Sequence, residues 1–110
     1  MSALLFRNWD FINFFFSTEL KQQKLLLRNL TDSQTDLISE IFFNLAHVVH
    51  LNPEQQKFIK RKLVAIKQLS QINKSRSNRR EVIKKYCTPA INILNEVKLN
   101  ILNAGKNFVE

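Results

Sequence analysis

The densest group of residues that could do chemistry is a run of positive charge in the second half of the chain. Residues 57–85 hold eleven Lys and Arg side chains and one acid, Glu81. Cations three and four residues apart on a helix present charge at intervals that suit backbone phosphates. The sequence therefore predicts a sequence-tolerant nucleic-acid surface, with DNA as the expected partner and RNA left open. Its expected members are Lys57, Lys60, Arg61, Lys67, Lys74, Arg76, Arg79, Arg80, Lys84 and Lys85.

The charge balance agrees with such a partner but permits others. The chain has a net charge of +8, and residues 57–110 hold thirteen basic side chains against three acidic ones. A balance this positive favours nucleic acid, an anionic membrane surface or an acidic protein. The basic residues could instead pair with Asp32, Asp36 and Glu40 of the preceding helix, which would make the charge structural. High solubility alone is a further explanation.

Catalytic and metal chemistry has little support in the sequence. His47 and His50 are three residues apart and could share a metal, but a zinc site needs three or four ligands. Cys87 has no known nucleophile motif around it, and a chain with one Gly cannot build a Gly-rich phosphate loop. We therefore expect no enzyme activity, no metal and no cofactor.

The elements that must position the basic residues are helical. One Gly and two Pro in 110 residues are too few for the tight turns of a sandwich or barrel. Apolar residues from Leu37 to Val49 repeat with the period of a helix that faces a core. The sequence predicts an all-α fold, a compact antiparallel bundle of about five helices in a single domain over residues 1–110.

Capping signals give the expected boundaries. The expected helices run from a cap at Ser17 or Thr18 to about Arg28, from a Thr31–Gln34 capping box to about His50, from Asn52–Pro53 to about Ile72, over 78–86 after Ser77, and from Thr88–Pro89 to a C-terminal Gly105. The third helix turns Phe58, Ile59, Leu63, Ile66 and Leu69 inward and its cations outward. Residues 17–50 and 89–103 are expected to build most of the core.

An aromatic segment precedes the first of these expected helices. It could enter the core, form a self-association surface or lie in a membrane interface, and its lack of flanking cations disfavours the membrane. Five large apolar groups are more than a short segment can leave in water, so we expect a homo-oligomer. The expected oligomerisation residues are Trp9, Phe11, Phe14, Phe15 and Phe16.

The chain also resembles the short basic helical proteins of Polinton (Maverick) elements and their adintovirus and adenovirus-like relatives. The resemblance covers residues 20–86 and departs at residues 86–89 (YCTP), where relatives often have a Gly-Gly turn. The matching stretches are residues 25–29 (LLLRN), 31–38 (TDSQTDLI), 51–57 (LNPEQQK) and 75–85 (SRSNRREVIKK). The resemblance implies a small virion or core-associated protein that contacts the genome.

The expected location follows from similar observations. No window approaches the ~18 apolar residues of a membrane span, and the start lacks the pattern of a signal peptide. We expect an intracellular protein of the nucleus or virion, without integral membrane association. The favoured function is DNA binding in a viral or transposon-derived context, with genome packaging as one such role. The alternatives are a helical interaction protein that homo-oligomerises or modulates a host factor, and, more weakly, peripheral membrane attachment.

Overall fold

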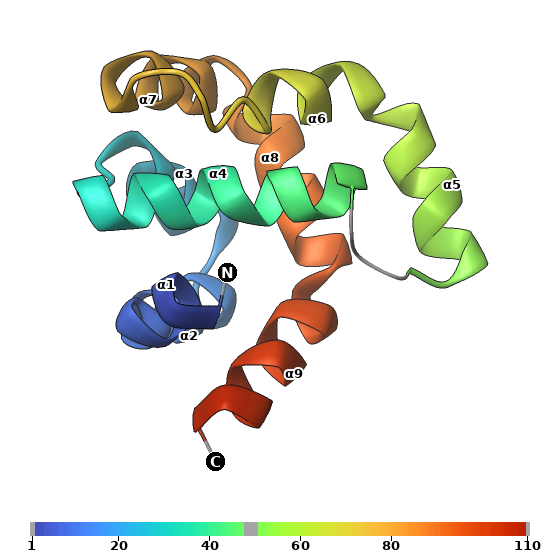
Figure 1. The fold of residues 1–110 in the computed structure, drawn as a ribbon, viewed down its shortest axis with the longest axis horizontal. Helices are drawn as coiled ribbons and strands as arrows, with labels where there is room; N and C mark the ends of the chain where they lie inside the picture. The colour runs from blue at the N-terminus through green and yellow to red at the C-terminus, as the bar shows by residue number, and fades with distance from the viewer. Residues whose placement is uncertain (1, 48–50, 110) are drawn as a thin grey trace.

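The computed structural model describes residues 2–47 and 51–109, and these residues form nine α-helices and no strand (Figure 1). The helices are α1 (Ser2–Arg7), α2 (Trp9–Ser17), α3 (Leu20–Arg28), α4 (Asp32–His47), α5 (Pro53–Arg61), α6 (Leu63–Leu69), α7 (Arg76–Lys85), α8 (Cys87–Glu96) and α9 (Lys98–Val109). The predicted all-α class is confirmed. Figure 1 shows α4 running across the molecule while α5 and α9 run down it, so a bundle of about five antiparallel helices is not confirmed.

The two strongest capping signals are confirmed. The backbone N–H of Gln34 donates to Thr31 Oγ1 at 3.2 Å, and the Thr31 N–H donates to Gln34 Oε1 at 3.0 Å. Asn52 and Gln55 make the same reciprocal pair at 2.8 and 3.2 Å, with Pro53 in the first turn of α5. Each box satisfies two N–H groups that the helix itself leaves unpaired, which fixes where α4 and α5 begin.

Four junctions of one residue each divide the chain into more helices than expected. At each, φ lies between −103° and −111° and ψ between 16° and 28°, near the bridge region rather than the helical one. The junction residues are Asn8, Lys62, Tyr86 and Val97. The prediction of one helix from Pro53 to about Ile72 is therefore wrong, because the helix breaks at Lys62 and α6 ends at Leu69.

The predicted cap of α7 is displaced by two residues. Ser75, not Ser77, accepts the N–H of Asn78 at 3.2 Å, so α7 begins at Arg76. This shift brings Arg76 into the first turn of α7, where its side chain can reach the neighbouring helix.

The remaining predicted boundaries also need correction. Pro89 has no N–H to donate to the carbonyl of Lys85, so the chain turns at Tyr86 and α8 begins before Thr88, which does not cap it. Glu19 precedes α3 in place of Ser17 or Thr18. Helix α9 continues through Gly105, and no described residue has a positive φ. The predicted end near His50 falls outside the described residues.

The buried apolar side chains form one cluster to which every helix contributes. The largest of them are Phe15, Phe42, Leu5, Ile12, Leu27, Leu37, Ile38, Ile41, Ile66, Ile83, Ile91 and Ile93. The expectation that residues 17–50 and 89–103 build most of the core understates the N-terminus, because α1 and α2 supply Leu5, Ile12, Phe15 and Phe16. Buried Gln23 ties this part to the rest, since its Nε2 donates to the carbonyl of Phe15 at 2.9 Å.

The predicted oligomerisation residues are therefore divided. Phe15 and Phe16 are buried in the core of the same chain and cannot contact a second copy from that position. Trp9 and Phe11 are half-buried against the same core. Phe14 of α2 is exposed and lies on the surface. Burial within one chain explains most of this aromatic cluster without an oligomer.

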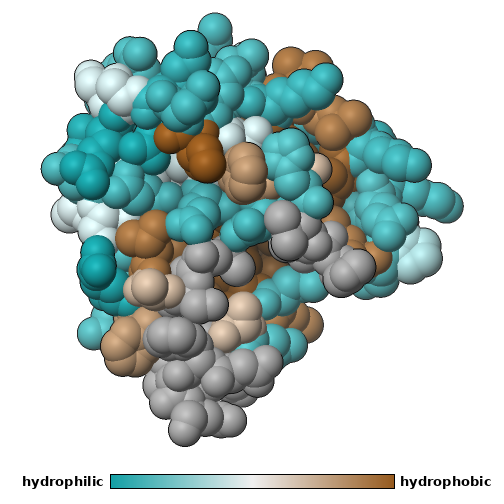
Figure 2. All heavy atoms as spheres, viewed as in Figure 1, coloured by the Kyte–Doolittle hydropathy of each residue, from teal (hydrophilic) through white to brown (hydrophobic). Residues whose placement is uncertain are grey.

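Helix α4 positions the basic segment. It packs against α1 on one side and against α6 and α7 on the other. Figure 1 shows α7 and α6 along the upper border and α5 down the right-hand side. Figure 2 shows this upper border as mainly hydrophilic, with hydrophobic side chains over the region of α6. No helix in the described ranges is long and apolar enough to span a membrane.

Candidate nucleic-acid interface

The first part of the candidate interface is the α5–α6 cationic surface, which we define as Lys57, Lys60, Arg61 and Lys67. All four side chains are exposed. The capping box fixes the start of α5, and Ile59 is buried in the core. The helical period places Lys57 and Arg61 on the side of α5 opposite Ile59, and Lys60 between the two sides. Burial of Ile59 therefore leaves these three side chains facing solvent.

Two further contacts hold α5 in place. Gln55 Nε2 donates to Asn100 Oδ1 at 2.9 Å, which ties the first turn of α5 to α9. At the other end, the guanidinium of Arg61 and the ammonium of Lys62 lie 5.9 and 5.8 Å from the ring centroid of Phe58. These distances suit cation–π attraction, so the half-buried ring steadies two cations where α5 turns into α6.

Lys62 is absent from the residues predicted by sequence. It is the junction residue between α5 and α6, and in a continuous helix its spacing from Phe58, Ile59 and Ile66 would have placed it on the apolar side. Its position in the charge run was visible, but the break that directs its ammonium onto Phe58 was not.

None of the four cations of the α5–α6 cationic surface forms an ion pair within the described structure. The sequence has no acid between Glu54 and Glu81, and the ion pairs seen among the described residues involve none of the four cations. Their charge is therefore directed to solvent rather than to another part of the chain.

Two apolar side chains interrupt this surface. Leu63 is exposed although its spacing predicted a core position, and its neighbour Val64 is 74% exposed. The break at Lys62 places Leu63 at the start of a new helix, outside the core. Ile66 and Leu69 of α6 are buried as predicted, and Ala65 is buried with them. A small apolar area thus lies among the cations, which agrees with the hydrophobic side chains that Figure 2 shows over α6.

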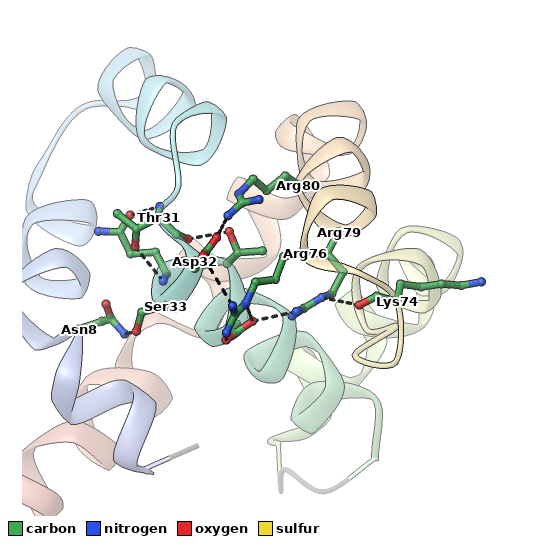
Figure 3. A network of polar contacts seen from close by, with 11 residues as sticks. Asn8, Thr31, Asp32, Ser33, Lys74, Arg76, Arg79 and Arg80 are labelled. Carbon is green, nitrogen blue, oxygen red and sulfur yellow. Dashed lines mark hydrogen bonds and ion pairs between the residues drawn. The ribbon is translucent and has the colours of Figure 1, made fainter.

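The second part of the basic segment forms the arginine clamp, which we define as Arg76, Arg79 and Arg80 of α7 with Asp32 and Asp36 of α4. Arg76 binds Asp36 with two hydrogen bonds, from Nε at 3.2 Å and from Nη2 at 2.8 Å. Arg79 Nη2 donates to the same carboxylate at 2.8 Å. Arg80 Nη2 contacts Asp32 Oδ1. Figure 3 shows all three arginines reaching from α7 toward the first turns of α4.

The clamp has an electrostatic effect on Asp36. Hydrogen bonding to Arg76, followed by that to Arg79, outweighs burial and holds the pKa of the Asp36 carboxyl below its ordinary value. Arg79 is fixed further, because its Nε donates to the carbonyl of Lys74 at 3.0 Å, just before α7 begins. The clamp therefore joins α4, α7 and the connection that precedes α7.

The structure corrects the prediction that Arg79 and Arg80 point outward. They turn to α4 and pair with Asp36 and Asp32, which was the alternative expectation. The prediction of one cationic face without acidic residues is therefore wrong at α7. The reason is the start of α4: its capping box places both carboxylates in the first turns, facing α7.

The three remaining predicted lysines are exposed. Lys74 points away from the clamp (Figure 3). Lys84 lies 3.4 Å from Glu81 of its own helix, and the ammonium of Lys85 is 5.6 Å from the ring centroid of Tyr86. Lys74 and Lys85 thus keep their charge available, whereas Lys84 is partly neutralised.

A hollow of about 420 Å³ lies beside the clamp, next to the connection between α6 and α7. Its polar lining includes the carboxylates of Asp36 and Glu40 and the guanidinium of Arg79, and its apolar lining includes Phe43 and Ile72. Opposite charges meet in this lining, so it gives a polyanion no excess of positive charge to bind.

Cys87 and His47 are the described residues among those considered for catalysis or metal binding. Cys87 is buried, and burial raises the pKa of its thiol, which disfavours the reactive thiolate. The His47 ring lies 4.6 Å from that of Phe43, and His50 is outside the described residues. No group of three or more His, Cys, Asp or Glu residues able to hold a metal occurs in the described part of the chain.

Comparison with known proteins gives no further guide. No protein-family model, no curated protein and no solved structure matches this chain.

Proposed function

We propose that this protein binds nucleic acid, DNA in the first place, through the α5–α6 cationic surface and with little preference for sequence. The observation that carries this proposal is the exposure of Lys57, Lys60, Arg61 and Lys67, none of which is in an ion pair with another described residue. Cations of this kind contact backbone phosphates, which are the same at every sequence.

The proposed interface is smaller than the sequence predicted. The arginine clamp takes Arg76, Arg79 and Arg80 out of the freely available charge, because Asp32 and Asp36 already bind them. Lys74 and Lys85 extend the interface at its margin. The resemblance to Polinton proteins suggests the setting in which such binding would occur, a viral or transposon-derived genome that is packaged or held in a core. Self-association through exposed Phe14 belongs to the same proposal.

The binding experiment compares two neutralised variants of equal net charge. K57Q/K60Q/R61Q removes three cations from the proposed surface, and R7Q/K21Q/R28Q removes three exposed cations from the first half of the chain. Each is titrated against fluorescently labelled 20-base-pair duplexes of two unrelated sequences, and anisotropy is measured. We expect the first variant to lose at least about tenfold in affinity at 0.1 M salt and the second to lose much less.

The outcomes distinguish DNA binding at the α5–α6 cationic surface from attraction by the net charge of the whole chain. Equal losses in the two variants would show that net charge alone attracts DNA and would contradict an α5–α6 site. A strong preference for one duplex over the other would contradict sequence tolerance. Circular dichroism of both variants establishes that the helices remain.

An acidic protein is the second candidate partner, and exposed Leu63 and Val64 favour it. Protein interfaces combine a central apolar contact with a polar rim, whereas phosphates gain little from an exposed valine. The variant L63S/V64S tests this candidate. Loss of a protein partner from pull-down, with DNA affinity unchanged, would favour the acidic protein.

A further inference from the structure

The ion pairs of the arginine clamp differ in their access to solvent. Arg79 and Asp36 form the inner pair, with side chains 13% and 23% exposed. Asp32 is 61% exposed, and its partners Arg76 and Arg80 are 50% and 30% exposed. The outer part of the clamp is thus open to an approaching ligand, whereas the inner pair is closed.

The clamp also holds more positive than negative charge. Three guanidinium groups share two carboxylates, and Asp32 serves two arginines, with its Oδ2 3.6 Å from Arg76 Nη1. A guanidinium binds phosphate through the same forked pair of N–H groups with which it binds a carboxylate. Asp32 therefore occupies the Nη2 donor of Arg80 and lies beside Nη1 of Arg76, while the Nε and Nη2 groups of Arg76 are bound to Asp36.

Separation of Asp32 from its arginines leaves no buried charge. Its carboxylate is already largely in water, where ion pairs contribute little. Asp32 lies in the first turn of α4, where the helix dipole favours a negative charge with or without an arginine. The hydrogen bonds of Asp36 with Arg76 and Arg79 can keep α4 and α7 together while the pairs of Asp32 open.

The position of the clamp relative to α5 and α6 decides whether a nucleic acid bound there could also reach it. Helix α6 lies between α7 and α5 along the border of the molecule in Figure 1. A nucleic acid bound on α5 and α6 therefore brings further phosphates of the same backbone toward α7.

We propose that Arg80, together with the Nη1 group of Arg76, forms a second phosphate-binding point, which Asp32 covers in the free protein and releases to the backbone of bound nucleic acid. This inference rests on the proposed function of the α5–α6 cationic surface. In it, Asp32 limits affinity, and Asp36 stays bound to Arg76 and Arg79.

A double-mutant cycle with a matched control tests this exchange. D32N removes the covering carboxylate, while D10N removes another exposed carboxylate from the first turn of a helix, α2, with the same change in net charge. We expect D32N to bind the 20-base-pair duplex about threefold or more tighter than D10N, with a salt slope steeper by about one. R80Q should then lower the affinity of D32N by a larger factor than it lowers that of the wild-type chain.

A second measurement follows the arginines in the unaltered protein. The NMR signal of the Nε–Hε group of Arg80 should shift when duplex DNA is added. The signals of Arg76 and Arg79, whose Nε groups donate to Asp36 and to the carbonyl of Lys74, should stay in place. Equal affinity of D32N and D10N, equal effects of R80Q in both backgrounds, or an unshifted Arg80 signal would each overturn the exchange.

The same assay distinguishes the two proposals. Tighter binding by D32N, together with no loss in K57Q/K60Q/R61Q, would contradict the α5–α6 site and leave the α7 arginines as the binding residues. Loss in K57Q/K60Q/R61Q, with D32N equal to D10N, would contradict only the exchange. Absence of binding by the wild-type chain and by D32N would overturn both.

Discussion

The basic segment contains two regions that the sequence alone makes look alike. In the arginine clamp, Arg76, Arg79 and Arg80 meet the carboxylates of Asp32 and Asp36. On the α5–α6 cationic surface, four exposed cations face solvent with no ion pair inside the described structure. The difference teaches that charge density along a chain does not measure available charge, because acids 40 to 48 residues away neutralise one region and not the other.

Residue type follows the same division. A guanidinium has a planar fork of donors that can serve carboxylates from two directions, as Arg76 serves Asp36 and Asp32. An ammonium is a more strongly hydrated point charge, which suits the three lysines that remain in solvent on α5 and α6. Arg61 is the exception, and it lies over the ring of Phe58.

The largest expected effect is a difference in how much the two regions contribute to the free energy of unfolding. R79A removes the less exposed partner of the clamp and leaves Asp36 with one arginine, so we expect a loss of about 2–3 kcal/mol in the free energy of unfolding. K57A removes an exposed cation without an ion pair, and we expect a change within about 0.5 kcal/mol. Urea denaturation followed by circular dichroism measures both. Similar losses in the two variants would remove the distinction between a structural and a free region.

A smaller effect should appear as a pH dependence that belongs to the clamp alone. The pKa of Asp36 is lowered on folding, so its contribution to stability is fully present above the ordinary carboxyl value of 3.8 and is lost as the pH falls through the lower folded value. We expect thermal unfolding temperatures to fall more steeply in acid for the wild-type chain than for D36N. The variant K57A should keep the full acid dependence, and a flattened profile for K57A would contradict the assignment to Asp36.

The smallest expected effect concerns the apolar residues beside the cations. Leu63 and Val64 are exposed, so L63S/V64S should change the free energy of unfolding by no more than about 0.5 kcal/mol. If phosphates are the ligand, its DNA affinity should stay within about twofold of the wild-type value. A larger loss of DNA affinity would mean that contact with these side chains is part of recognition.

Much of the fold could be predicted where local chemistry decides it. The capping boxes at Thr31 and Asn52 form as predicted because they use only residues within one helical turn. The breaks at Lys62 and Val97 could not be predicted, because neither residue is Gly or Pro and tertiary packing sets their backbone angles. The break at Lys62 in turn exposes Leu63, which its spacing had assigned to the core.

The candidate site likewise has one part that the sequence could predict and one part that it could not. The exposure of Lys57, Lys60 and Arg61 follows from the period of α5 once its cap and the burial of Ile59 are known. The orientation of Arg79 and Arg80 depends on how α4 packs against α7, which no local pattern determines. The sequence offered pairing with Asp32 and Asp36 as an alternative, and only the relative placement of two helices decides between the alternatives.

The salt dependence of DNA binding tests the central claim, that the α5–α6 cationic surface supplies the phosphate contacts. The slope of log affinity against log salt concentration is measured for the wild-type chain, for K57Q/K60Q/R61Q and for R7Q/K21Q/R28Q. Loss of three phosphate contacts should flatten the slope of K57Q/K60Q/R61Q by about 2.7, while R7Q/K21Q/R28Q keeps a slope close to that of the wild-type chain. An unchanged slope in K57Q/K60Q/R61Q would contradict the account.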